Sequence, residues 1–417
     1  MVLQYLAAEH LAGGPYGQKR QSSQPANIRE ATIMTSPLAH AQNLIRCRSV
    51  TPDEGGALDY LESQLGAVGF TCHRLPFSER RTPDVDNLYA RIGEGSPHVC
   101  FAGHIDVVAP GDDAAWRHQP FAAEIDDGIL YGRGAVDMKG AVAASLAATL
   151  LFLLENGGAP KGSISFLITA DEEGPAINGT RKVVDWLLKR GERPDCCILG
   201  ECTSEAAVGD TIKIGRRGSL SGELRVRGVQ GHVAYPHKAR NPLPPLIDAL
   251  NLLNTKQLDS GSTHFQPSNF EITSIDTRNK ASNVIPATAT ARFNVRFNDH
   301  HTGDNLKAWI ESQVQAALLD TGVDYTLDYE PASESFMTDP GGFVQKLSAA
   351  IEAETQREPL LSTGGGTSDA RFIKDLCPVV EVGLLNATAH KVDECVPVAD
   401  LDRLTQIYTR FLRLAFP

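Results

Sequence analysis

Short apolar runs alternate with helical patterns in the first half of the chain, up to about residue 217. Three of these runs predict buried strands, and each ends in polar residues: 98–108, 163–173 and 196–201. The Ala- and Leu-rich stretch 137–158 predicts a helix that Gly157 and Gly158 end. Strands that alternate with helices are typical of an α/β fold with a mostly parallel sheet, in which functional residues gather at the carboxyl ends of the strands.

The pattern changes at about Gly218, where apolar and polar residues begin to alternate. This alternation predicts half-exposed antiparallel strands over two stretches: 219–233 and 287–297. Two stretches with helical spacing lie among them: 243–254 and 304–319. These features together predict a second domain, of the α+β class.

The order of helix and then strand returns after about Ser333, with a helix predicted at 343–355 and a strand at 378–385. The second domain therefore interrupts the first one in the sequence. We predict a larger catalytic domain and a smaller inserted domain with these boundaries: residues 34–217 with 333–417, and residues 218–332.

The first 33 residues differ from the rest, because they are mixed in character and contain no continuous apolar core. This composition is not that of a secretory signal. A helical pattern begins after Met34, since Thr35 or Ser36 can cap a helix and Pro37 suits its first turn. We expect residues 1–33 to be a disordered extension and take Met34 as a candidate for the true start of translation.

The composition is that of an ordinary globular protein. The chain has 417 residues, of which 42% are hydrophobic, enough for two domains with substantial cores. Its formal net charge of −12 argues against a nucleic-acid partner, because phosphate binding needs a basic surface. The longest apolar stretch, around 141–154, is too short to span a membrane, so we expect no membrane partner.

Eight cysteines are scattered along the chain, without a C-x-x-C pair. Their irregular spacing in a chain of this length argues against a disulfide scaffold, so we expect reduced thiols in the cytoplasm. We interpret the cysteines, including Cys202 beside Glu201, as small core residues rather than activated thiols.

Polar residues at strand ends and helix starts provide the candidate chemistry. They are His104, Asp106, Asp137, Glu172, Glu173, Glu201 and His390. Neighbouring carboxylates such as those of Glu172 and Glu173 repel each other unless a positive partner lies close by. Imidazole and carboxylate ligands together suit Zn²⁺, with Co²⁺ or Mn²⁺ as substitutes, so the pattern indicates a metal site.

The positions of five of these residues indicate a site for two ions. Asp137 lies at the start of a helix and has two oxygens, so it could bridge two ions roughly 3.5–4 Å apart. His104 and Glu201 would complete the coordination of one ion, and Glu173 and His390 that of the other.

The other two residues would support this chemistry. Asp106, two residues after His104, would orient that imidazole through its second nitrogen. Glu172, next to a ligand but not one itself, would act as the general base. Taken singly, each residue also has a structural explanation: a strand-end histidine is often only a hydrogen-bonding group, paired glutamates in loops are usually solvated, and Asp137 could cap a helix.

Six stretches of the chain resemble the di-zinc amidohydrolases related to aminoacylase and carboxypeptidase G. They are GHIDVVAPGD, GRGAVDMKGA, TADEEGPAINGT, GRRGSLSGELRVRGVQGHVAYPH, STGGGTSDARFI and LNATAHKVDECV. The resemblance covers about residues 36–415, and no metal-binding or base position departs from the family pattern. It implies a zinc-exopeptidase-like catalytic domain, an inserted dimerisation domain that acts as a lid, a homodimer, and two Zn²⁺ ions per subunit.

The resemblance also implies roles for individual residues. It assigns the two ions to the same five ligands as above, with Glu172 as the general base and Asp106 as the support of His104. The inserted domain would form the dimer. From it, His232 would reach into the active site of the partner and help to stabilise the oxyanion.

The narrower elements GRRGS, GHVAYPH, GGGTSDARF and NATAHKVDE resemble the desuccinylase branch of this family. This narrower resemblance implies hydrolysis of an anionic N-acyl amino acid, N-succinyl-L,L-2,6-diaminopimelate, in bacterial lysine biosynthesis. Arg216 and Arg217 precede the inserted domain, and guanidinium groups suit carboxylate recognition. The same resemblance assigns seven more residues to the substrate: Ser219, Tyr235, Asn283, Arg296, Gly366, Thr367 and Asn386.

Two alternatives remain open at this point. An acetylornithine deacetylase or an aminoacyl dipeptidase of the same family would use the same ligands and base on another substrate. A non-catalytic dimeric binding protein would keep the fold, but such proteins usually lose a ligand or the base, and this chain retains them all.

Overall fold

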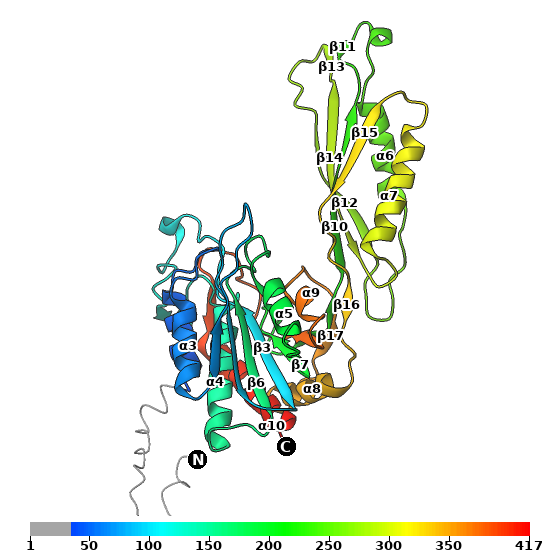
Figure 1. The fold of residues 1–417 in the computed structure, drawn as a ribbon. Helices are drawn as coiled ribbons and strands as arrows, with labels where there is room; N and C mark the ends of the chain where they lie inside the picture. The colour runs from blue at the N-terminus through cyan, green and yellow to red at the C-terminus, as the bar shows by residue number, and fades with distance from the viewer. Residues whose placement is uncertain (1–34) are drawn as a thin grey trace, which may run out of the picture.

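The computed structural model describes residues 35–417, so the predicted extension 1–33 and the candidate start at Met34 lie outside the described residues. Figure 1 shows a larger body, which contains both the first and the last described residues, and a slimmer body that stands away from it. The larger body is built on an eight-stranded sheet flanked by helices, and the slimmer one on a four-stranded sheet backed by two helices.

The large sheet has the strand order β1-β2-β6-β3-β7-β18-β8-β17. Its strands are β1 (Thr71–Arg74), β2 (Leu88–Gly93), β3 (His98–His104), β6 (Ser163–Thr169), β7 (Cys196–Leu199), β8 (Thr211–Lys213), β17 (Leu360–Ser362) and β18 (Val379–Glu381). β3 runs parallel to both β6 and β7, and β7 runs parallel to β18, whereas β2 is antiparallel to β6. Every residue of β3 and β6 is buried, as expected for strands covered on both faces. The predicted α/β class with a mostly parallel sheet is confirmed.

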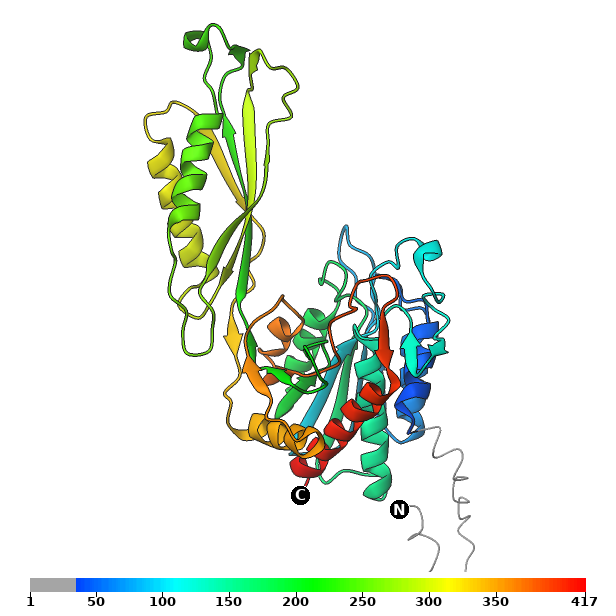
Figure 2. The same ribbon diagram turned by 180° about the vertical axis from the view of Figure 1, so that it is seen from behind.

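Helices cover both faces of this sheet. α4 (Lys139–Glu155) packs beside α2 (Pro37–Arg46) and α10 (Val398–Ala415) on one face (Figure 2). α5 (Thr180–Leu188) and α9 (Ala370–Ile373) contact each other on the opposite face (Figure 1). The remaining helices of the larger body are α3 (Ala57–Ala67), α8 (Gly342–Thr355) and the 3₁₀ turn Asp113–Ala115. Within residues 35–417, no helix is long and apolar enough to cross a membrane.

The sequence explains where two of these helices lie. Ser36 caps α2, because its hydroxyl accepts a hydrogen bond from the Ala39 N–H at 3.3 Å, and Pro37 occupies the first turn. α4 is buried almost all round, as its Ala- and Leu-rich sequence indicates, because an apolar residue on any side of it meets the sheet or a neighbouring helix.

A small three-stranded sheet lies beside the large one. Its strands are β4 (Ile125–Asp126), β5 (Ile129–Tyr131) and β19 (Cys395–Pro397). β5 and β19 are antiparallel, with Cys395 opposite Tyr131. This pairing brings the segment that leads into α4 beside the segment that leads into α10, although the two lie far apart in the sequence.

The slimmer body contains an antiparallel sheet of order β12-β14-β10-β15, backed by two helices. Its elements are β10 (Gly218–Arg227), α6 (Leu243–Thr255), β12 (Asn269–Asp276), β14 (Thr288–Phe297), α7 (Gly303–Leu318) and β15 (Asp324–Tyr329). Buried and half-exposed residues alternate along β10, which is the pattern seen in the sequence. α7 begins at a capping box, in which the Thr302 hydroxyl accepts from the Asn305 N–H at 3.2 Å.

The strand predicted at 219–233 ends earlier than expected. A Cβ atom on Gly228 would lie 1.9 Å from the Arg240 carbonyl oxygen, so the backbone here packs against another segment instead of continuing β10. The chain then forms the short strand β11 (Gly231–His232), which pairs with β13 (Val284–Ile285) and precedes the 3₁₀ turn Pro236–Lys238.

Two separate groups of buried apolar residues form the cores. One spans the larger body, and the other contains only residues between Leu220 and Leu318. The chain passes between the bodies through β9 (Gly215–Arg216) and β16 (Phe336–Met337), which pair with each other. We propose that the two cores belong to two domains, with the inserted one at residues 218–332.

The division into domains can be tested at Phe293, a buried ring of the smaller core that stacks on Phe270 at 5.0 Å between ring centroids. Phe293→Ala should destabilise the smaller domain by about 3–5 kcal/mol, because it leaves a large cavity. Hydrogen exchange should accelerate within residues 218–332 and stay unchanged in β3 and β6. Equal acceleration in both bodies would show that they unfold as one unit.

Candidate metal centre

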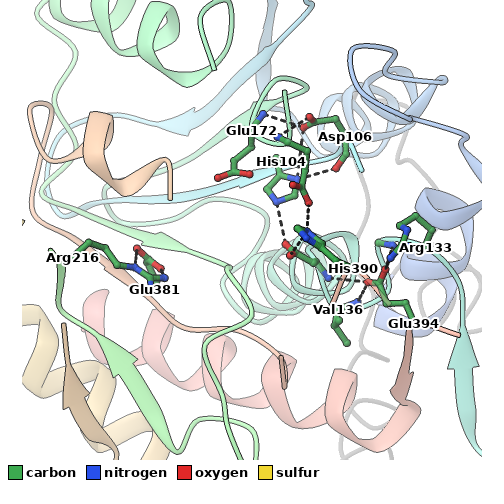
Figure 3. Close-up of polar contacts among 12 residues, drawn as sticks. His104, Asp106, Arg133, Val136, Glu172, Arg216, Glu381, His390 and Glu394 are labelled. Atoms are coloured by element: carbon green, nitrogen blue, oxygen red, sulfur yellow. Dashed lines mark hydrogen bonds and ion pairs between the residues drawn. The ribbon is translucent and has the colours of Figure 1, made fainter. Parts of the chain in front are cut away.

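The predicted metal ligands, together with Glu172 and Asp106, converge at the carboxyl edge of the large sheet. His104 ends β3, the turn after β6 carries three consecutive acidic residues, 171–173 (the acidic triplet), and Glu201 follows β7. Asp137 immediately precedes α4, and His390 lies in the loop between β18 and β19. Figure 3 shows the side chains of His104, Glu172 and His390 reaching toward a common centre from these separate elements.

Asp137 lies between the two imidazoles. Its Oδ1 is 3.3 Å from His104 Nε2, and its Oδ2 is 3.3 Å from His390 Nε2. His390 Nε2 also lies 2.7 Å from Glu173 Oε1. Each oxygen of one carboxylate therefore faces a different histidine, which is the arrangement that a bridging ligand requires.

The other carboxylates lie within reach of the same histidine. His104, Glu172 and Glu201 place ligand atoms within 4.8 Å of one another, as do His104, Asp137 and Glu173. Asp137, Glu201 and Cys202 form a third such group. Burial raises the pKa of the Cys202 thiol, because it disfavours the charged thiolate.

Two buried atoms without hydrogen-bond partners indicate that the site is built for a cation. They are His104 Nε2 and Glu201 Oε1. His104 Nδ1 lies 2.9 Å from the Asp106 carbonyl oxygen, which can only accept a hydrogen bond. The proton therefore sits on Nδ1, and Nε2 carries a lone pair toward the cluster, as in metal-binding histidines.

Asp106 supports the site in a different way from the one predicted. Its backbone carbonyl, not its carboxylate, orients His104, since Asp106 Oδ1 is 3.7 Å from His104 Nδ1. The carboxylate instead accepts hydrogen bonds from the backbone N–H groups of Glu172 at 3.3 Å and Glu173 at 3.0 Å. Asp106 thus fixes the turn that carries the acidic triplet as well as the imidazole (Figure 3).

Burial and mutual repulsion dominate the electrostatics of the cluster. Burial raises the pKa of Glu172 to about 8, and the nearby carboxylates of Asp369 and Glu173 add to this shift. Burial likewise raises the pKa of Glu201. Burial disfavours the charged form of Asp137, but the nearby His104 and His390 outweigh this effect and hold the pKa of the carboxyl below its usual value.

His390 experiences the opposite influence. Hydrogen bonds to Asp137 and Glu173 raise its pKa to about 10, so these three side chains together stabilise a positive charge between them. Its side chain is 52% exposed, whereas that of His104 is 1% exposed. The cluster therefore has a buried half and a half open to solvent.

A cavity of about 360 Å³ adjoins the cluster at Glu201. Four residues that the sequence analysis assigned to the substrate line it: Arg216, Gly366, Thr367 and Asn386. Lys213 and Ser362 also line it, and the Lys213 ammonium lies 3.3 Å from the Ser362 hydroxyl. Its wall thus carries two positive charges and the carboxylates of Glu201 and Glu205, together with hydroxyl and amide groups.

Arg216 already has a partner within the protein. Its Nε donates to Glu381 Oε1 at 2.9 Å, and its Nη1 donates to the Gly364 carbonyl at 3.1 Å. The Ser368 hydroxyl donates to the same Glu381 oxygen at 2.5 Å. Arg216 therefore pairs with Glu381, as Figure 3 shows, and also holds the glycine-rich loop and lines the cavity.

The remaining predicted residues lie in the smaller body. His232, Tyr235 and Asn283 gather at its far end around β11, with the His232 and Tyr235 rings 5.6 Å apart and the Val233 N–H donating to the Asn283 carbonyl. They are remote from the histidine and carboxylate cluster of the same chain (Figure 1).

Three further predicted residues lie at the base of the smaller body. Ser219 and Arg296 are cross-strand neighbours there, and Arg217 donates to Asn269 Oδ1 at 2.9 Å. Burial and the nearby Arg217 guanidinium lower the pKa of Arg296, so two cationic side chains lie close together at this position.

Two residues that line or support the site, Lys213 and Glu394, are absent from the set predicted from the sequence. Lys213 stands between Ile212 and Ile214 in a buried strand, and a charged residue in such a run usually has a specific partner. Glu394 follows a loop that contains a predicted ligand, and its side chain is fully buried.

Curated relatives match almost the whole chain. One from Rhodopseudomonas palustris is 56% identical over 386 residues, which cover 92% of this chain and 100% of the relative. Another, from Rhodospirillum centenum, is 58% identical over 380 residues, covering 91% of this chain and 97% of the relative. Both are named succinyl-diaminopimelate desuccinylase.

Solved structures share the fold at much lower identity. An aminopeptidase from Bacillus cereus superposes with a TM-score of 0.74 at 18% identity, covering 91% of this chain and 98% of that chain. A dinuclear metal-binding peptidase from Bacillus subtilis does so with a TM-score of 0.69 at 16% identity, covering 94% of this chain and 99% of that chain. The model of peptidase family M20/M25/M40 matches residues 100–414. On this match and on the identity to its relatives, the chain belongs to peptidase family M20/M25/M40.

Proposed function

We propose that this chain hydrolyses N-succinyl-L,L-2,6-diaminopimelate to succinate and L,L-2,6-diaminopimelate, a step of lysine biosynthesis. The relatives that bear this activity in their names are 56–58% identical over more than nine-tenths of the chain. The observation that carries the chemical part is the arrangement of Asp137 between two imidazoles, with the half-buried Glu172 beside them. The free cysteines of the chain and the proposed role in biosynthesis favour a cytoplasmic location.

Five side chains would hold the metal ions. His104, Asp137 and Glu201 would bind one ion, and Asp137, Glu173 and His390 the other, with Asp137 shared. Their imidazole and carboxylate donors suit Zn²⁺, and Co²⁺ is the expected substitute. When bound, two such ions polarise the substrate carbonyl and make a water molecule acidic enough to react at neutral pH.

Glu172 would move the protons of the reaction. It lies beside the ligands, and its raised pKa suits a group that first accepts a proton and later returns it. It would take the proton of the attacking water and pass it to the leaving amine of diaminopimelate. The amide bond breaks as the amine leaves, and succinate remains as the second product.

The cavity beside Glu201 would receive the anionic substrate. Lys213 and Arg216 supply positive charge there, and Thr367 and Asn386 supply hydrogen-bonding groups. The glycine-rich loop 364–366 also lines the cavity, and the backbone N–H groups of such a loop suit a carboxylate.

A homodimer would complete each site. His232, Tyr235 and Asn283 lie too far from the ligands to act in their own chain, as Figure 1 shows, and they stand exposed at the end of the smaller domain. We propose that His232 of a second copy reaches the substrate carbonyl and helps to stabilise the oxyanion. Closure of the smaller domain would bring it there.

The base assignment predicts the behaviour of Glu172→Gln. Activity should fall by about 10²- to 10⁴-fold, because the proton carrier is lost. The zinc content, measured by elemental analysis, should stay at the value of the unmodified protein. Glu94→Gln, at an exposed carboxylate in the loop before β3, serves as the control. Full activity of the Glu172 variant would refute the assignment.

The substrate assignment is tested on three compounds at equal concentration: N-succinyl-L,L-diaminopimelate, N-acetylornithine and a dipeptide. We expect preferential hydrolysis of the succinyl compound, its loss with a chelator and its recovery with added zinc. Preference for another compound would be consistent with the proposed metal and base chemistry but would refute the proposed substrate. Inactivity on all three, without bound zinc, would favour a binding protein.

The role of His232 in the partner predicts complementation between two inactive variants. His232→Ala and Glu172→Ala should each be inactive as homodimers. Mixed dimers should contain one intact site, because Glu172 and His232 then come from different chains, so random mixing should restore about a quarter of the normal activity. If the mixture stays inactive although mass spectrometry detects mixed dimers, His232 does not act across the dimer.

A further inference from the structure

A buried carboxylate lies behind the candidate metal centre. Glu394 Oε2 accepts hydrogen bonds from Arg133 Nη1 at 2.8 Å and from the Gly134 N–H at 2.9 Å. Its Oε1 accepts from the Val136 N–H at 2.9 Å and from the Asp137 N–H at 3.2 Å. One fully buried side chain thus receives four hydrogen bonds from the segment that ends at Asp137 (Figure 3).

The charge of Glu394 is balanced by Arg133, which is also buried. The Arg133 guanidinium lies over the Trp116 ring, 5.2 Å from its centroid, and the Trp116 N–H donates to the Pro110 carbonyl at 3.0 Å. A buried ion pair of this kind contributes little net stability compared with apolar side chains of the same size. Its use here is better explained by the geometry that it imposes on the backbone.

The backbone of Glu394 makes the same connection. The Gly132 N–H donates to the Glu394 carbonyl at 2.9 Å, which extends the pairing of β5 with β19 by one step. Glu394 lies only four residues after His390. It therefore ties the segment that leads to Asp137 to the loop that carries His390, and those two side chains lie 3.3 Å apart.

We propose that Glu394 is a positioning residue, which fixes the Asp137 carboxylate relative to His390 and so sets the affinity for the metal ions. The inference rests on the metal centre proposed above, but it does not depend on the identity of the substrate. Hydrogen-bond partners behind metal ligands commonly change metal affinity by about 10- to 100-fold. Glu394 accepts a hydrogen bond from the backbone N–H of the ligand Asp137. Its loss should therefore change the position of the Asp137 carboxylate.

The proposal is tested with Glu394→Gln, which keeps the shape of the side chain. The amide nitrogen of glutamine donates, so it would face N–H groups that need an acceptor, and the segment before Asp137 should shift. We expect zinc affinity to fall by about 10- to 100-fold, measured on metal-free protein by competition with a chromophoric chelator. At low zinc kcat should fall while KM stays close to normal, and excess zinc should restore part of kcat.

The control is Glu192→Gln. Glu192 is a partly buried carboxylate of the same domain, paired with Arg91 at the opposite edge of the large sheet. This variant should lose thermal stability in the metal-free form and keep the normal zinc affinity. If Glu394→Gln also loses only stability and binds zinc as tightly as the unmodified protein, Glu394 is structural and the proposal is overturned.

Two further outcomes are decisive. If Glu394→Gln does not fold, Glu394→Asp replaces it, because aspartate keeps the charge on a side chain that is shorter by one methylene. This variant should show an intermediate zinc affinity. A normal zinc affinity would overturn the proposal. If the unmodified protein itself binds no zinc, the proposed metal centre is wrong and this inference falls with it.

Discussion

Carboxylates crowd into a small buried volume at one edge of the large sheet, and their mutual repulsion is the constraint that the surrounding structure satisfies. Each acidic group with a supporting role has its own local compensation. Glu394 has Arg133, Glu381 has Arg216, and the Asp106 carboxylate has backbone N–H groups. These arrangements keep the supporting carboxylates paired or hydrogen-bonded without any metal ion, as buried charges require.

The carboxylates of Glu172 and Glu201, at the centre of the cluster, lack such partners among the described residues. Glu172 and Glu201 lie within ligand distance of His104, and burial raises the pKa of both. No basic side chain among the described residues forms an ion pair with either of them. The supporting carboxylates thus find their partners within the chain. Glu172 and Glu201 would find theirs in bound metal ions. This division follows a general rule of metal sites, in which the outer groups are satisfied first and hold the inner ones in place.

The sequence predicted the parts of the fold that depend on local patterns. Apolar runs located β3, β6 and β7, and the polar residues that end them converge because parallel strands end at one edge. Contacts between distant segments carried no such signal. The pairing of Arg216 with Glu381 joins residues 165 positions apart, and Glu394 reaches a segment about 260 positions away. In the proposed dimer, the place of His232 relative to a substrate would also depend on a second chain, which a single sequence does not describe.

The passage between the two bodies has a mechanical consequence. The two connections between the bodies, β9 and β16, pair with each other as antiparallel strands, so they form one two-stranded connection, called the strap below. Arg216 belongs to this strap, and its guanidinium lines the cavity beside Glu201. If the smaller body turns about the strap, the same turn reshapes the wall of the cavity. Occupancy of the cavity and orientation of the smaller body would then be thermodynamically linked, each altering the other by the same free energy.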